Sequence, residues 1–456
     1  MTSPVDPVEG GAAVEEPVTV GRRGWAIDTT PLRNPHYRRL FGGIAATMLG
    51  QQMTLVAVPF QVYELTRSSL LVGVTSIVAL VPLIVFGLLG GAIADAMDRR
   101  KLMLITSSGA AVTSALLALQ ALLPGGGNLV VLWVLAACVS GFAAVNQPTR
   151  SAVIPALVGP SGIAAANALS MTVRQAGVIV GPLIAGVLIG SGNLFLAYTV
   201  DAIGFLVATA LLRGLPHLSP GTAVGRLRLG AAVRGVGEGF AFLRTQPALL
   251  MTFVVDIIAM TFGWPQAVFP ELSQTRFAES ANGLGWLFAG ASIGALLMGL
   301  SSGWVTRVDR QGAVVLAAIA AWGLAIVGFG FAPALWLAVV CLAVAGAADM
   351  VSAVLRTSML QIAAPEEMRG RMQGVFIVVV AGGPRLGDLR AGALATATSV
   401  TVAMVSGGVV IVVAMLVVAL VVPSFRLFRA GRPAEAARPG SPAPESGEDR
   451  PGPFAT

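Results

Sequence analysis

The chain has 456 residues, of which 55% are hydrophobic and only 11% are charged, and its mean hydropathy is +0.82. A typical soluble domain carries about 25% charged residues, so this composition excludes a soluble globular protein, a disordered chain and a fibrous one. It is the composition of a protein that crosses a membrane many times. The one lysine, Lys101, precedes Leu102, which excludes a phosphate-binding loop of the G-x-x-x-x-G-K-[ST] type.

The predicted elements begin after a polar N-terminal tail at residues 1–36, which lacks the short apolar core of a signal peptide. Two sets of six apolar runs follow. A polar stretch at 214–247 separates the two sets, and a Pro-, Ala- and Arg-rich tail at 425–456 follows the second set. Each run is long enough to cross a bilayer. The runs are 39–63, 70–94, 102–123, 129–149, 164–190, 194–213, 248–272, 281–305, 312–332, 334–355, 372–396 and 400–423. We therefore predict an all-α integral membrane protein with twelve transmembrane helices in two pseudo-symmetric six-helix bundles, residues 37–213 and 248–424.

The basic residues are strongly biased to one side of these spans. The side that holds both tails and the even-numbered loops has 24 of the 29 basic residues. The opposite side has only Arg67 and Arg276, and the other three lie within spans. Because basic loops stay in the cytoplasm, the bias predicts that both tails and the central loop are cytoplasmic. The net charge of +7 is then a topology signal and not a nucleic-acid footprint.

The two sets of spans repeat each other at a near-constant interval. The Asp-Arg pair at 98–99 recurs at 309–310, 211 residues later, and Arg150 recurs as Arg356, 206 residues later. Chance is the alternative, since arginine at cytoplasmic span ends follows from topology alone. A duplicated six-helix unit predicts a substrate path where the halves meet, near the middle of the membrane.

A glycine-containing, charged loop at 90–101 joins spans two and three. It resembles the signature loop of the major facilitator superfamily, roughly G-x-x-x-D-x-x-x-R-[RK]. Its places are filled by Gly91, Asp95, Arg99 and Arg100. In that family the loop latches the two halves together on the cytoplasmic side, here against the start of span eleven. Asp309 and Arg310 form a weaker copy, and a charge cluster set by topology alone is the alternative.

Other segments resemble one branch of that superfamily, the siderophore-exporter-like and multidrug-exporter-like proteins of bacteria. They are Q-V-Y-E-L-T at 61–66, N-Q-P-T-R at 146–150, A-N-A-L at 166–169 and R-G-R at 369–371. The resemblance implies export of a bulky small molecule across a bacterial inner membrane, in exchange for protons, with no cofactor and no metal. Span five also contains a helix-packing motif similar to the Gly-Pro motif of proton-coupled antiporters. Its residues are Gly177, Gly181, Pro182 and Gly186.

Ionisable residues inside spans are costly to insert and are therefore functional candidates. In the fold that the resemblance implies, spans one, four, seven and ten line the cavity. Asp256 in span seven and Asp349 in span ten are thus the first candidates to carry a coupling proton. Asp388 is a third, because it follows the interruption at 382–384 of span eleven. For Asp256 and Asp349 the alternative is a fixed ion pair, for instance with Arg174.

The candidates for the substrate cavity are polar or aromatic residues within the spans. They are Gln51, Gln52, Asn146, Arg174, Trp264 and Arg385. A buried arginine cannot lose its proton, so Arg174 requires an acidic partner or an anionic substrate. Packing against neighbouring helices is the alternative for the two glutamines and for Trp264.

Three function classes remain: a secondary exporter, a transporter-fold sensor or scaffold without net transport, and a membrane enzyme. The G-x-S-x-G match at 299–303 lies in a predicted membrane helix and not in a strand-to-helix turn, so it does not support a hydrolase. We predict an exporter that is not an enzyme, with a small-molecule substrate, protons and the lipid bilayer as partners, no nucleic acid, and a monomeric state. The residues do not identify the substrate or choose between proton and sodium coupling.

Overall fold

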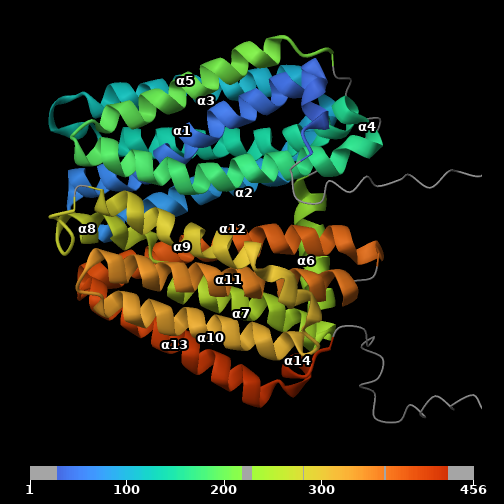
Figure 1. Cartoon of the computed structure of the whole chain (residues 1–456), viewed down its shortest axis with the longest axis vertical. Helices are drawn as coiled ribbons and strands as arrows, with labels where there is room; N and C mark the ends of the chain where they lie inside the picture. Colours follow the sequence, from blue (N-terminus) through green and yellow to red (C-terminus); the bar gives the residue numbers. More distant parts are fainter. Residues whose placement is uncertain (1–27, 218–228, 281, 364–365, 430–456) are drawn as a thin grey trace, which may run out of the picture.

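The computed structural model describes residues 28–217, 229–280, 282–363 and 366–429, and within these ranges it contains helices and turns but no strand. Figure 1 shows two helical bundles stacked along the long axis of the molecule. The first half of the chain forms one bundle and the second half forms the other. The two halves of the sequence are therefore also two halves in space.

The first bundle is built from five long helices. They are α1 Pro35–Thr66, α2 Ser69–Ala96, α3 Arg99–Ala121, α4 Leu129–Gly190 and α5 Leu194–Arg213, with the short 3-10 helices η1 Thr30–Arg33 and η2 Pro124–Gly126. Asn34 begins α1 by accepting hydrogen bonds from the backbone N–H groups of His36 and Tyr37. α5 packs against both α1 and α3, and α4 packs against α1 and α2.

The second bundle follows a similar plan with more interruptions. Its elements are α7 Pro247–Gly263, η3 Gln266–Val268, α8 Phe269–Gln274, α9 Gly283–Leu300, η4 Ser302–Arg307, α10 Gln311–Phe331, α11 Leu335–Ala363, α12 Glu366–Ala397, α13 Val400–Val421 and α14 Pro423–Arg426. α10 packs against α11 and α13, and α9 packs against α11. The largest buried apolar cluster is rich in residues of this half, among them Phe269, Phe329 and Met415.

α4 is continuous by hydrogen bonding but consists of two antiparallel limbs. Gly159 interrupts it with a φ of 68° and a ψ of 172°, a backbone conformation that favours glycine. In a straight helix residues 143 and 178 would lie about 50 Å apart. Ala143 and Val178 instead line one cavity. α4 therefore supplies the predicted spans four and five.

Ten helices in the described part of the chain are long and apolar enough to cross a membrane. One of them, α4, crosses twice, and α12 has 32 residues and packs beside α2 and α7. Counting both gives the twelve predicted spans, and the all-α membrane fold is confirmed. Outward-facing side chains such as Leu300 and Leu420 are 78% and 75% exposed, as expected where lipid surrounds the bundles.

The predicted polar loop at 214–247 contains a helix, α6 Leu229–Thr245. Leu243 is fully buried in a cluster with Leu249 and Phe253, whereas Glu238 and Arg244 are exposed. α6 packs against α12, and Figure 1 shows it upright beside the junction of the two bundles. The search for apolar runs did not detect this helix, because only one of its faces is apolar and the stretch is polar on average.

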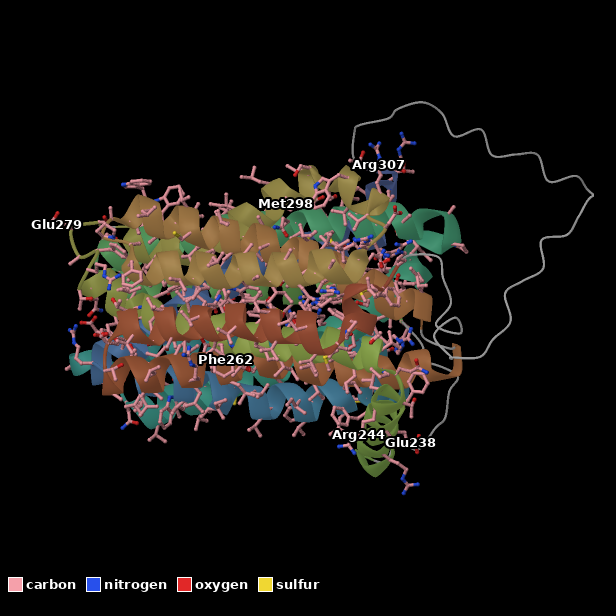
Figure 2. All side chains as sticks on the ribbon, turned by 90° about the horizontal axis from the view of Figure 1, so that it is seen from below. Glu238, Arg244, Phe262, Glu279, Met298 and Arg307 are labelled. Carbon is pink, nitrogen blue, oxygen red and sulfur yellow. The ribbon has the colours of Figure 1, made fainter. Side chains whose placement is uncertain are left out.

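The molecule has two polar ends. Figure 2 shows Glu279 at one end, Arg307, Arg244 and Glu238 at the other, and Phe262 and Met298 between them. We call the end with Arg307 the tail end, since Figure 1 places the start of α1 and the last described helix, α14, there, and the end with Glu279 the far end.

The two bundles are tied together at the far end. Gln274 Nε2 donates to Glu64 Oε2 at 2.7 Å, and the backbone N–H of Leu70 donates to Thr396 Oγ1 at 3.0 Å. Ser69 Oγ also donates to the carboxylate of Glu271. Each of these bonds joins one bundle to the other, so the structure holds the far end closed.

Candidate functional site

A cavity of about 250 Å³ lies between α1 and the two limbs of α4. It is lined by four of the six predicted cavity residues, Gln51, Gln52, Asn146 and Arg174, and also by Arg150. The two arginines come from opposite limbs of α4, which the break at Gly159 brings together. We call this cavity the arginine cavity, because Arg150 and Arg174 are the charged residues among its described lining. No Asp or Glu is among that lining.

The arginine cavity leaves its guanidinium groups largely without protein partners. Arg150 donates a single described hydrogen bond, from Nη2 to Thr47 Oγ1 at 3.3 Å. Arg174 is exposed and not buried as expected, and it makes no hydrogen bond or ion pair with any residue that the structure describes. Asn146 turns its amide toward α3, donating to Thr106 Oγ1 at 2.8 Å and Ser107 Oγ at 3.3 Å. Asn146 thus holds α4 against α3 and also borders the cavity.

A second cavity of about 130 Å³ continues this region toward the other bundle. Gln51 lines both cavities, and Arg385 of α12 reaches the second one from the opposite half. The Asp388 carboxylate accepts hydrogen bonds from Ser76 Oγ at 2.6 Å and from the backbone N–H of Ala267 at 3.0 Å. Asp388 therefore links α2 of the first bundle to α12 and η3 of the second.

A third cavity, also about 130 Å³, lies within the second bundle and contains two predicted proton carriers, Asp256 and Asp349, together with Arg356. Arg356 Nη1 lies 2.6 Å from Asp256 Oδ1, and both side chains are almost fully buried. Arg356 Nε donates to Ser352 Oγ at 3.1 Å. We call this the carboxylate cavity. The fixed ion pair considered for Asp256 exists, but its partner is Arg356 and not Arg174.

Asp349 differs from Asp256 in having no direct partner. Its Oδ1 atom is buried and accepts no hydrogen bond in the described structure. It lines the carboxylate cavity and also a smaller cavity of about 50 Å³ that Trp264 borders. Asp349 therefore stands between the two spaces, one bordered by Arg356 and the other by Trp264.

The helix-packing motif lies at close helix contacts. A Cβ atom built on Gly181 would lie 2.5 Å from Cβ of Gln52, and one built on Gly186 would lie 2.7 Å from Cα of Gly285 in α9. Gly177 faces Met48 of α1 in the same way. Pro182 is buried in the same stretch of α4. The motif thus packs α4 against α1 at one level and against the second bundle at the far end.

The signature loop lies at the tail end. Arg99 donates to the carbonyl of Ala152 at 3.1 Å and Arg100 donates to the carbonyl of Arg213, so both arginines bind elements of their own bundle. The structure describes only the backbone of Gly91, of Asp95 and of the expected partner segment 369–372. The predicted latch contact therefore lies outside the described side chains. In the weaker copy, Asp309 and Arg310 are exposed.

Asp98 precedes these arginines and caps α3 by accepting a hydrogen bond from the backbone N–H of Lys101 at 3.0 Å. It also pairs with His217. Burial raises the pKa of Asp98, but the hydrogen bond from the Lys101 backbone N–H and the attraction of His217 in its protonated form outweigh burial and lower it. The His217 contact fixes the segment after α5 to the signature loop.

Sequence reasoning missed three features of these sites. Arg150 was considered only as one of the repeated arginines at span ends and not as a cavity residue, although it lines the arginine cavity. Arg356 was considered in the same way and was not named as the partner of Asp256, although it forms that ion pair. Ser76 was not singled out at all. The signal for the first two was present, since a basic residue inside the apolar boundary of a span requires a partner.

Comparison with known proteins now identifies the family. The profile of the family described as transmembrane secretion effector matches residues 26–443. The chain belongs to that family, a member of the major facilitator superfamily. The transporter shares 29% identity over 412 residues with an enterobactin exporter, EntS, of Shigella boydii serotype 4, covering 90% of this chain and 97% of the relative. EntS of Escherichia coli O157:H7 is 28% identical over 423 residues, covering 92% and 100%.

Solved structures share the fold of this transporter. The nucleoside transporter NupG superposes with a TM-score of 0.69 at 13% identity, over 86% of this chain and 100% of that one. A bacterial homologue of the human lysosomal transporter Spinster, in an inward-facing and unoccupied conformation, gives a TM-score of 0.63 at 17% identity, over 88% and 97%. The chain is therefore a multi-pass membrane transporter of the major facilitator superfamily whose relatives are exporters.

Proposed function

We propose that the transporter exports a siderophore-like or drug-like small molecule from the cytoplasm by alternating access, in exchange for protons. The tail end faces the cytoplasm in this proposal, in agreement with the bias of basic residues. The relatives named enterobactin exporters support a siderophore as the substrate. The far-end contacts between the bundles would have to break when the substrate is released outside.

The observation that carries proton coupling is the carboxylate cavity. Asp256 and Asp349 line this cavity with a single arginine, Arg356, which pairs with Asp256, so the group has an excess negative charge in a membrane-embedded space. Binding one proton removes that charge, and an isolated charge in such a place is costly. The Asp349 carboxylate has no direct hydrogen-bond donor among the described residues, so it can take up and release a proton without breaking a bond to them. Asp388 is a further coupling candidate, since protonation would weaken its hold on Ser76 across the bundles.

The test uses everted membrane vesicles that contain the transporter, are acidic inside, and carry a pH-sensitive dye. Iron-free enterobactin is added, and its uptake is followed in parallel with a labelled sample. We expect enterobactin to enter and to release protons from vesicles with the wild-type chain, and Asp349→Asn to prevent both. Glu279→Gln removes an exposed far-end carboxylate and is the control that should behave as wild type. Uptake without proton release would reject proton antiport, and no uptake would reject the siderophore substrate.

A further inference from the structure

The arginine cavity has a charge that the proposed export does not explain. Arg150 and Arg174 line it, and the described lining contains no acidic side chain to balance them. Both arginines lie on limbs of α4 that cross the membrane. Arg174 is exposed, whereas Arg150 is only partly exposed and lies deeper in the cavity. An arginine withdrawn from water inside a span, with no counter-charge beside it, is unfavourable. A negatively charged group in the cavity would balance Arg150 and could also reach Arg174.

The unused hydrogen-bonding capacity of these two residues leads to the same conclusion. A guanidinium has five N–H donors and stays protonated in proteins. Arg150 uses one of its donors, on Thr47, and Arg174 uses none among the described residues. The remaining donors face a cavity that Gln51, Gln52 and Ser151 also line. Paired arginines with free planar donors match the two oxygens of a carboxylate or a similar oxyanion.

The size and continuation of the space indicate how much of a ligand it takes. Small-molecule sites usually measure about 300–1,000 Å³, so a cavity of about 250 Å³ fits one end of a bulky molecule. The adjoining cavity, reached past Gln51, presents Arg385 from the other bundle. It offers room for the rest of the molecule along mainly apolar walls, among them Leu55 and Val139.

We propose that the arginine cavity binds an anionic oxygen group of the transported molecule, with Arg150 and Arg174 as its ligands, so that the substrate is an organic anion. This inference rests on the proposed export function and specifies the class of its substrate. Removing either arginine weakens binding of the anion, while a neutral analogue of the same shape gains nothing from them.

The test measures equilibrium binding to the purified full chain in lipid nanodiscs, without any gradient. The probes are 7-methoxycoumarin-3-carboxylate and its neutral N-methylamide, followed by fluorescence polarisation. We expect wild type to bind the carboxylate about 10- to 100-fold more tightly than the amide, the range for hydrogen bonds to a charged group. Arg174→Gln should remove most of that preference, and Arg174→Lys should keep part of it.

The control Arg307→Gln removes an exposed positive charge from η4, away from the cavity, and should keep the full preference. Because no described residue depends on Arg174, its variants should fold, and size-exclusion chromatography checks this. Equal binding of both probes, no binding of the carboxylate, or unchanged preference in Arg174→Gln would each overturn the anion site. Enterobactin-driven proton release would then still support export. Anion-selective binding with no enterobactin uptake would keep the site and reject the siderophore proposal.

Discussion

The two bundles place an arginine at corresponding positions and surround it in opposite ways. Arg150 in the first half and Arg356 in the second are separated by 206 residues. Arg150 lines a cavity without acidic side chains among its described lining and donates one described hydrogen bond. Arg356 lines a cavity with two aspartates and lies 2.6 Å from one of them. One guanidinium is available to a ligand, and the other is already neutralised by the protein.

The acids that make this difference are confined to one half. At the same interval, Asp349 corresponds to Ala143, which lines the arginine cavity, and Asp256 corresponds to Gly50. The two halves thus have an arginine at corresponding positions but different residues near it, acidic in the second half and small and neutral in the first. A small neutral residue leaves space and positive charge for an anion, whereas a carboxylate creates a group that responds to protons. We infer that the halves divide substrate binding and coupling between them.

The largest effect is expected at the acid that Arg356 holds. Asp256→Asn should abolish proton-driven export while the coumarin carboxylate still binds. An amide cannot neutralise Arg356, which would then balance the charge of Asp349 and leave no excess negative charge for a proton to remove, and the arginine cavity is untouched. Flux into everted vesicles and nanodisc binding measure the two properties. Proton-driven flux at the wild-type level, with equal amounts of inserted protein, would reject a coupling role for Asp256.

The corresponding arginines should differ in what they contribute to stability. Arg356→Gln leaves the buried Asp256 carboxylate unpaired, a change that costs about 3–5 kcal/mol. Arg150→Gln removes one hydrogen bond, worth about 0.5–1.5 kcal/mol, and relieves an uncompensated charge. Chemical unfolding of the detergent-solubilised protein, followed by tryptophan fluorescence, compares the two variants. Similar losses of unfolding free energy would mean that the two environments do not differ as described.

A smaller effect is expected where the halves meet. Ser76→Ala removes the hydroxyl that donates to Asp388 across the bundles, and a hydrogen bond to a charged group is worth about 1.5–3 kcal/mol. A smaller fraction of molecules should therefore have the far end closed, and a larger fraction should have it open. Spin labels at positions 66 and 275, on opposite bundles at the far end, should report a longer distance in a larger fraction of molecules.

The matched control for this measurement is Ser273→Ala, which removes a hydroxyl that donates to Pro270 within the second bundle. Both native cysteines, Cys138 and Cys341, are replaced by serine beforehand so that only the introduced positions carry labels. An identical distance distribution in Ser76→Ala and Ser273→Ala would show that the Asp388 contact does not hold the far end closed.

The smallest effect concerns the tail end. Because the pKa of Asp98 is lowered in the folded protein, its carboxylate stabilises the fold above its ordinary pKa, and this stabilisation is lost as the pH falls through the lowered value. Asp98→Asn keeps an N-cap residue for α3 but removes the charge beside His217. The variant should melt at a lower temperature than wild type at pH 7, and the difference should shrink as the pH falls toward about 3. A difference that stays undiminished at the lower pH would contradict this account.

Much of the architecture followed from residue chemistry alone. Runs of apolar residues must cross the bilayer as helices, because backbone polar groups find no water there. The cavity candidates also came from one rule: a polar residue inside a span is costly to insert, so it is a candidate for function. Four of the six candidates line one cavity. α6 was not anticipated, since its single apolar face disappears in an average over the stretch.

By itself, the sequence determined the number of spans, the two bundles and the membership of the major facilitator superfamily, because hydropathy and local motifs are properties of neighbouring residues. Only the tertiary structure decided which charges meet. Asp256 and Arg356 are 100 residues apart in the chain, and Ser76 and Asp388 are 312 apart. An ion pair or a hydrogen bond depends on separations of a few ångströms, which the packing of whole helices sets and residue order does not. The same packing left Arg150 and Arg174 facing a cavity without an acid among its described lining.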